Sequence, residues 1–291
     1  MSSLHISISA ETIFHIGPLA VTNSMLTGII VTMLIILFAV SAKSSLKPLS
    51  KPSKFQSLVE LIVESLNSLI EGIAGKGKKL KLFGPFIISF FIFILLNNWI
   101  GLLPGVGTIG ILEKETETTI EEVATTPANQ ETEDADIETS KEQEATEENA
   151  HVEESKGTFV PIFRPATADL NTTLALALIS IAMVQIFGVK FQKLSYFKKY
   201  FNLSSPINFV VGILELVSEI AKIISFSFRL FGNIFAGEVL LTVILFLVPV
   251  IIPMPFYGLE IFVGFIQSIV FSILSLVFFN MATLGHNEEH A

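Results

Sequence analysis

Cysteine is absent from this 291-residue chain, and two other residue types are nearly so. Without cysteine there are no disulfides, no thiolate metal sites and no cysteine nucleophiles. Only two of the 18 basic residues are arginines, Arg164 and Arg229, and Trp99 is the single tryptophan. Charged residues make up 15% of the chain. An arginine inside an apolar run of such a chain therefore needs a specific explanation.

Polar sequence is also scarce outside one segment. Hydrophobic residues account for 51% of the chain and the mean hydropathy is +0.67, which is too apolar for an ordinary soluble domain. Several apolar runs are long enough to cross a bilayer. No basic residue precedes the first of them, and no small-residue cleavage site follows it, so we expect no secretory signal. The sequence predicts a single multi-pass membrane domain over residues 1–291, surrounded by lipid, with no nucleic-acid partner.

The formal net charge of −9 comes from one segment. Residues 113–156 contain sixteen acidic residues and three lysines, which leaves the remainder of the chain at a net +4. This segment is rich in glutamate and threonine and has almost no large apolar residues, so it cannot bury enough surface to fold alone. We expect a disordered extracytoplasmic loop. A metal or partner site there is the alternative.

Five apolar runs predict five membrane-crossing helices. Residues 55–74 repeat apolar positions every three or four residues opposite a polar face, which is typical of a helix lying in the membrane interface. A leader of no special role is expected at 1–18. The fourth run would reach about 65 Å as a straight helix, against about 30 Å of hydrocarbon, so it must tilt, bend or break. The expected spans are 19–42, 83–103, 167–189, 206–248 and 256–284.

The lysines predict the orientation of these spans. Four lysines follow the first span and four follow the third, and both loops lie on the same side of the membrane. The positive-inside rule makes that side cytoplasmic. The N-terminus and the acidic segment are then outside, and the C-terminus is inside.

The fourth span contains a stripe of polar and small residues. An arginine at the centre of a bilayer costs about 3 kcal/mol or more and needs a partner or water. For Lys222, an ion pair with Glu215 or Glu219 that only joins the protein's own helices is one reading. For Arg229 no acid of the chain is clearly matched in depth, so we expect a partner molecule to meet it. At 100° per residue the stripe consists of Glu215, Ser218, Glu219, Lys222, Ser225, Arg229, Gly232, Asn233 and Ala236.

Other titratable residues lie toward the outer half of the membrane. Glu238 follows Arg229 by nine residues, Glu260 begins the last span, and Asp169 begins the third. Gln267 is two turns deeper than Glu260 on the same face and could reach the level of Arg229. No histidine occurs in any expected span. Two offset sets of proton-carrying groups, with a permanent cation between them, are therefore predicted.

Four motifs, in order, resemble one known family. The run RLFGN at 229–233 with AGE at 236–238 is similar to the signature of subunit a, the membrane stator of rotary ATP synthases. The resemblance extends to TNS at 22–24, NWIGLLPG at 98–105 and RPATADLN at 164–171. It covers nearly the whole chain except about 111–156.

The resemblance implies an all-α membrane protein whose two long, tilted C-terminal helices face a rotor ring. It implies a non-catalytic, proton-translocating subunit without cofactors, in a bacterial inner membrane, with a ring of c subunits and peripheral-stalk b subunits as partners. Arg229 would be the essential stator arginine, supported by Asn233 and Gln267. The outer half-channel would contain Glu238, Glu260 and Asp169, and the inner one Glu215 and Ser218.

One position departs from the family pattern. Familiar bacterial members have histidine where this chain has Glu260, so Glu238 and Glu260 would share one proton if they were close.

A moving partner would explain the unmatched arginine. A carboxyl group on that partner would be neutral facing lipid and ionised facing Arg229. It would then load a proton from one path and release it into the other, and the arginine would block direct leakage.

Two other function classes fit the sequence less well. A self-contained ion channel or secondary transporter would show inverted repeats or broken helices, and no convincing repeat is present. An intramembrane hydrolase would need two acids at one depth around a substrate gap, which Glu238 and Glu260 meet only loosely.

Overall fold

The computed structural model describes residues 7, 9–44, 53–103, 106, 109–113, 158–193, 196, 200, 206–248 and 251–284. Met1–Ile111 and Val160–Ala291 together form one compact unit, and Leu112–Phe159 form another. The predicted acidic loop at 113–156 lies outside the described residues, apart from Glu113. Its expected disorder, and the single-domain interpretation, stay predictions.

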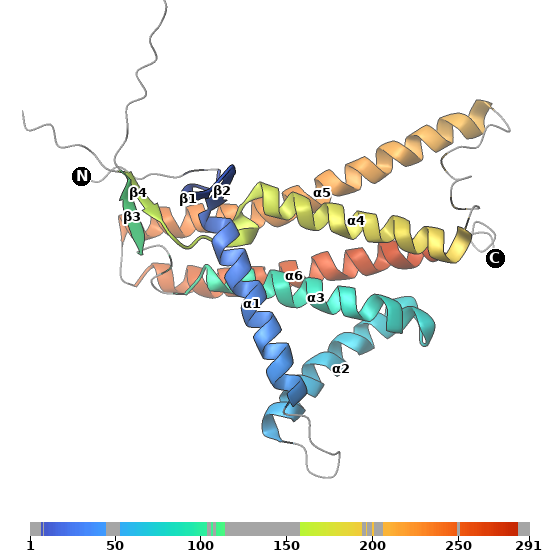
Figure 1. Cartoon of the computed structure of the whole chain (residues 1–291), viewed down its shortest axis with the longest axis horizontal. Helices are drawn as coiled ribbons and strands as arrows, with labels where there is room; N and C mark the ends of the chain where they lie inside the picture. Colours follow the sequence, from blue (N-terminus) through green and yellow to red (C-terminus); the bar gives the residue numbers. More distant parts are fainter. Residues whose placement is uncertain are drawn as a thin grey trace, which may run out of the picture. The chain divides into compact units, whose positions relative to one another are not determined.

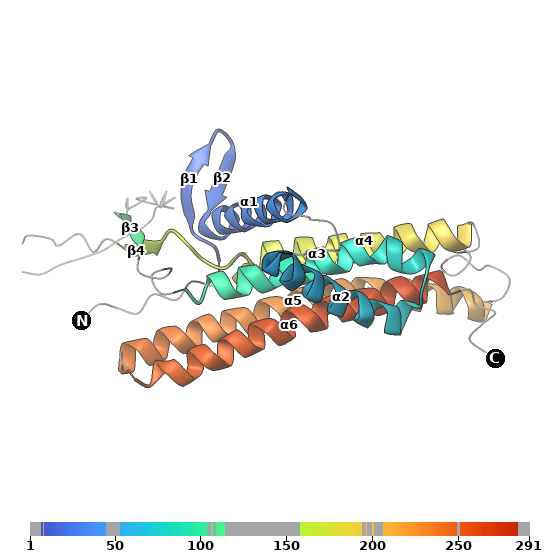
Figure 2. The same cartoon turned by 90° about the horizontal axis from the view of Figure 1, so that it is seen from below.

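The described part of the chain is built mainly of helices (Figures 1 and 2). They are α1 Asn23–Ser44, α2 Lys54–Ala74, α3 Lys78–Ile100, the short 3-10 helix η1 Ala166–Ala168, α4 Leu170–Gln192, α5 Pro206–Leu247 and α6 Pro253–Thr283. Five of them, α1, α3, α4, α5 and α6, are long and apolar enough to cross a membrane, and α2 is not among these five. The predicted all-α membrane class is confirmed.

Residues 12–22 form a hairpin, which the sequence analysis did not predict. Strand β1 (Thr12–Ile16) pairs antiparallel with β2 (Leu19–Thr22). Gly17 turns the chain at φ 61°, a left-handed conformation that suits glycine. The first span therefore begins at Asn23 rather than at residue 19. A second two-stranded sheet joins β3 (Gly110–Glu113) and β4 (Thr158–Pro161).

Local chemistry explains where several helices begin. The Thr22 hydroxyl accepts the Met25 N–H at 3.3 Å, as expected for a cap of α1. Ser53 caps α2 by accepting from the Gln56 N–H. Helix α6 starts at Pro253, three residues earlier than predicted, because proline fits the first turn of a helix.

Helices α3, α4, α5 and α6 pack side by side. Helix α3 lies along α6, and α4 lies along both α5 and α6. Phenylalanine rings fill the interior, including a group formed by Phe83, Phe187 and Phe279 with ring centroids 4.9 to 5.6 Å apart. Hydroxyl pairs also join the helices, with Ser180 2.8 Å from Ser275. Such small polar contacts are typical of helix pairs in membranes.

Helix α5 is continuous over 42 residues, about 63 Å. A break, one of the three predicted solutions to its length, is therefore excluded. Figure 1 shows the first part of α5 leaving α4 and α6. Large apolar side chains there are exposed, among them Ile207, Val210, Leu214 and Val217. The described residues therefore leave a wide apolar surface of α5 uncovered.

Candidate functional site

Arg229 lies in the middle of α5 and is exposed. Its guanidinium donates to the Ser225 hydroxyl at 3.4 Å, one turn earlier on the same helix. Within the described ranges no carboxylate lies within ion-pair distance of it. The adjoining Phe228 and Ile224 are also exposed, at 57% and 51%. The charge of Arg229 thus projects from an apolar surface of the chain.

Asn233 and Gln267 contact each other, a pairing that the sequence did not predict. The Asn233 amide donates to Gln267 Oε1 at 2.7 Å, which joins α5 to α6 one turn beyond Arg229. Gln267 is buried, and its Nε2 has no hydrogen-bond partner within the described part. A buried amide donor without an acceptor carries a desolvation cost. Gln267 therefore has a free donor at the level of the α5 polar stripe.

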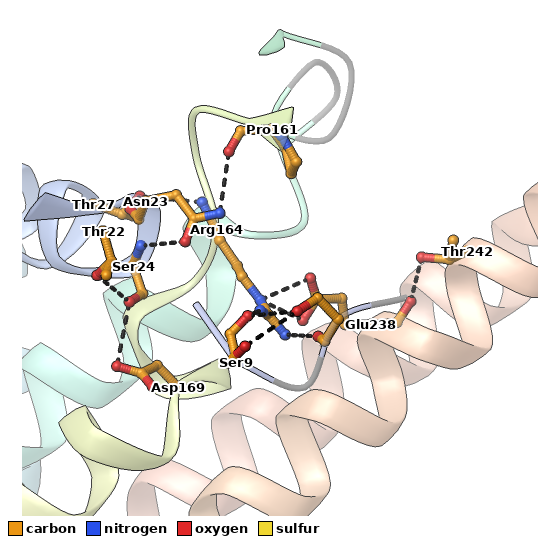
Figure 3. A network of polar contacts seen from close by, with 11 residues as sticks. Ser9, Thr22, Asn23, Ser24, Thr27, Pro161, Arg164, Asp169, Glu238 and Thr242 are labelled. Carbon is orange, nitrogen blue, oxygen red and sulfur yellow. Dashed lines mark hydrogen bonds and ion pairs between the residues drawn. The ribbon is translucent and has the colours of Figure 1, made fainter. Parts of the chain in front are cut away.

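Glu238 is paired with the other arginine of the chain. The Arg164 Nε lies 3.2 Å from both carboxylate oxygens of Glu238 (Figure 3). The Arg164 side chain is 5% exposed and that of Glu238 is 34% exposed. The guanidinium also lies over the Phe235 ring, 5.9 Å from its centroid. Sequence reasoning placed Arg164 only in a motif and missed this pair, although the scarcity of arginine was a signal for it.

The N-terminal segment completes the surroundings of Arg164. The two terminal guanidinium nitrogens of Arg164 donate to the backbone carbonyls of Ser9 at 2.9 Å and Ser7 at 3.0 Å. The backbone N–H of Arg164 donates to the Thr27 hydroxyl of α1 at 3.3 Å. Arg164 thus joins the N-terminal segment, α1 and α5, and it holds Glu238 in one place.

Asp169 acts as the N-cap of α4. Its carboxylate accepts from the Asn171 N–H at 3.2 Å, and from the hydroxyls of Ser24 and Thr172 at 3.3 Å each. Figure 3 shows the Ser24 contact beside the Arg164 network, with α1 contributing to both. These contacts explain why a carboxylate is kept in a buried position. A role for Asp169 in an outer proton path stays a prediction.

Glu260 is buried at 8% exposure near the start of α6. Its carboxylate lies directly against Gly237 of α5, where a Cβ would overlap it. No hydrogen bond or ion pair satisfies this carboxylate in the portion of the chain that the structure covers. Glu238 and Glu260 are therefore held around adjacent positions of α5, but only Glu238 has a cationic partner.

The N-terminal half of α5 contains the remaining predicted residues. Glu215 lines a cavity of about 220 Å³, whereas Ser218 is exposed and does not line it. Glu219 and Lys222 line the same cavity and form an ion pair at 2.8 Å. The sequence predicts this pair as one alternative for Lys222 and gives Glu219 no place in a proton path.

Tyr196 also lines this cavity, and Tyr200 lies next to it. The hydroxyls of Tyr196 and Tyr200 both donate to Gln185 Oε1, at 2.9 and 3.2 Å. Burial, and then the hydrogen bond with Tyr200, raise the pKa of the Tyr196 phenol, so Tyr196 stays neutral under physiological conditions. Among the described residues no group of three or more histidines or carboxylates is placed to hold a metal ion.

Comparisons with known proteins agree on one family. The family model described as "ATP synthase A chain" matches residues 25–280. "ATP synthase subunit a" of Moorella thermoacetica is 26% identical over 94% of this chain and 96% of its own length. "ATP synthase subunit a, chloroplastic" of Stigeoclonium helveticum is 30% identical over 90% of this chain and 85% of its own. "ATP synthase subunit a" of Gloeobacter violaceus is 27% identical over 98% of this chain and 94% of its own length.

Proposed function

We propose a function from one premise: the chain belongs to the ATP synthase A chain family, that of subunit a in the membrane sector of ATP synthases. We propose that it is the non-catalytic stator that exchanges protons with a rotating ring of c subunits. Peripheral-stalk b subunits would hold it still. The N-terminus would lie outside a bacterial inner membrane and the C-terminus in the cytoplasm.

This proposal is carried by the exposure of Arg229, beside which the described residues place no carboxylate. A fixed cation in lipid surroundings is stable only when an acid or water meets it. A rotating partner that brings one carboxylate after another to Arg229 would stabilise this cation. The uncovered apolar surface of α5 around Arg229 suits contact with another membrane helix.

Two half-channels would reach Arg229 from opposite sides. On the outer side Glu238 and Glu260 would pass protons inward, with Asp169 near the entrance. Glu215 and Ser218 would serve the inner side, Glu215 from the cavity and Ser218 from the exposed face of α5. Asn233 and Gln267 would orient groups beside the arginine through their mutual hydrogen bond. Each charge that crosses is worth about 2.3 kcal/mol per 100 mV, which would drive the ring.

Replacement of Arg229 tests the proposal. We expect Arg229→Gln to abolish proton-driven ATP synthesis by the assembled complex in sealed vesicles, because a neutral side chain cannot stabilise the ionised partner acid. ATP synthesis after an imposed proton gradient is the measurement. Co-purification of the variant with the other membrane subunits controls for assembly. Coupled synthesis that persists in Arg229→Gln would contradict the proposal.

The isolated chain provides a second test. When the chain is reconstituted alone in vesicles with a proton gradient, we expect no proton flux above that of empty vesicles. Robust flux without the other subunits would favour a self-contained channel.

A further inference from the structure

A polar cavity lies among the ends of α4, α5 and α6, and its lining includes residues without an assigned role. It measures about 220 Å³, enough for several waters at about 30 Å³ each. Helix α5 contributes Glu215, Glu219 and Lys222 to the lining, and Tyr196 follows α4. The lining residues from α6 are not titratable. An inference about this cavity rests on the proposed function, because it concerns the inner proton path.

Glu219 is the most buried charged group at this cavity, with 7% of its surface exposed. Its Oε1 accepts from the Lys222 ammonium at 2.8 Å, but its Oε2 is buried and has no hydrogen-bond partner within the described ranges. A buried carboxylate oxygen without a donor is costly. Glu219 also lines the cavity, so water there would exchange a proton with its carboxyl group.

Lys222 is held in place from two sides. Its ammonium binds Glu219, and it lies over the Phe278 ring of α6, 5.0 Å from the centroid. Cation–π contacts of this kind fix the position of an ammonium group. The Glu219–Lys222 pair is therefore attached to both helices of the proposed proton path.

The cavity lies along α5 at a position that suits a proton path leading to Arg229. Glu219 precedes Arg229 by ten residues, about 15 Å along the helix axis. Ser218, which the sequence analysis assigned to the inner path, is exposed outside the cavity. The geometry thus directs Glu219 rather than Ser218 toward the polar space on this side of the arginine.

We propose that Glu219 carries protons in the inner path and that Lys222 positions it against the water of this cavity. A proton that reaches the Glu219 carboxylate forms a neutral carboxylic acid, while Lys222 keeps its charge. Transfer of that proton to a cavity water restores the carboxylate. Glu215 and Tyr196 are the other titratable groups that face the same space.

The test compares a proton carrier with a purely structural ion pair. In the assembled complex in sealed vesicles, we expect Glu219→Gln to slow ATP-driven proton pumping about 10²-fold, the lower end for a positioned proton-transfer group. Glu219→Asp should restore part of the rate. Glu64→Gln, which removes an exposed carboxylate of α2, is the matched control and should pump normally.

A double variant separates the two roles. If the ion pair is only structural, removal of both charges should be tolerated better than removal of one. We expect the double variant Glu219→Gln, Lys222→Gln to pump as slowly as Glu219→Gln alone. Recovery of pumping in the double variant, or normal pumping by Glu219→Gln, would overturn the proposal. Variants are compared at equal assembly, measured by co-purification with the other membrane subunits.

Access of water to the cavity is tested through the absence of cysteine from the chain. Ala282 lines the cavity, whereas Ser275 is fully buried elsewhere on α6. We expect Ala282→Cys in the complex to react with a small, charged, membrane-impermeant methanethiosulfonate reagent, and Ser275→Cys to stay unmodified. An unreactive Ala282→Cys would contradict a water-filled cavity.

Arg229→Gln distinguishes failure of this inference from failure of the proposed function. If Arg229→Gln abolishes pumping while Glu219→Gln pumps normally, only the role of Glu219 is wrong. If Arg229→Gln also pumps normally, the proposed function is wrong, and the inner-path role of Glu219 is wrong with it.

Discussion

The two arginines of the chain have opposite surroundings. Arg164 is 4% exposed and binds Glu238 and two backbone carbonyls. Arg229 is exposed, and among the described residues its one hydrogen bond is a long contact to Ser225. Because neither guanidinium loses its charge, the first can only fix neighbouring groups, whereas the second is free to meet an outside partner. Burial, rather than residue type, therefore separates the arginine that fixes its neighbours from the one to which the proposed function gives an outside partner.

Loss of the Arg164 charge should lower the stability of the protein, because it leaves Glu238 without its cationic partner. We expect Arg164→Gln to destabilise the protein by about 2 kcal/mol, between the values for buried and surface pairs, because Glu238 is about a third exposed. The measurement is heat resistance of the detergent-solubilised complex. Arg164→Lys should lower the heat resistance less than Arg164→Gln does.

A double-variant cycle shows whether the pair itself is responsible. Combining Arg164→Gln with Glu238→Gln should cost less than the sum of the two single changes, because no unpaired charge is left behind. Strict additivity would show that Arg164 acts through the carbonyls of Ser7 and Ser9 alone.

At the scale of the helix, close contact between α5 and α6 depends on a missing side chain. Gly237 leaves the space that the Glu260 carboxylate occupies. We expect Gly237→Ala to assemble normally, since the displaced group is the flexible end of Glu260 and alanine favours a helix by about 1 kcal/mol. Proton pumping should fall, because the Glu260 carboxylate must move.

Gly258 provides the matched control on α6. It lies two residues from Glu260 and has nothing within 4 Å of its added Cβ. Gly258→Ala should pump at the unaltered rate. If Gly237→Ala pumps equally well, the position of the Glu260 carboxylate has no role in proton transfer.

Element positions could be predicted from the sequence, but contacts between distant elements could not. Apolar runs located all five spans, since burial in lipid demands length and hydropathy. Residues 19–22 were assigned to a span although they are a strand, because a short apolar run does not distinguish the two. Arg164 and Glu238 are 74 positions apart, and no periodicity relates residues on different elements. The 100° rule grouped Ser218 with Glu219, but only packing against α6 decides which of them is buried.

For the whole molecule, the alternation of lysine-rich loops predicts which side each end faces. Pro18 in the hairpin turn and Lys76 beyond α2 are both exposed. We expect Pro18→Cys to react with an impermeant thiol reagent in intact cells, and Lys76→Cys to react only in inverted vesicles. The native chain has no cysteine and is the unlabelled control. The reverse pattern would invert the proposed orientation.

The solitary exposed guanidinium also bears on biogenesis. Before any partner is present, a freshly inserted copy holds Arg229 against acyl chains or draws water and headgroups toward it, at about 3 kcal/mol or more. Docking onto the c-subunit ring of the proposed function would remove that penalty. A copy that finds no ring would keep this unmet charge and would then be degraded by proteases. The lifetime of the chain would therefore depend on the supply of ring subunits.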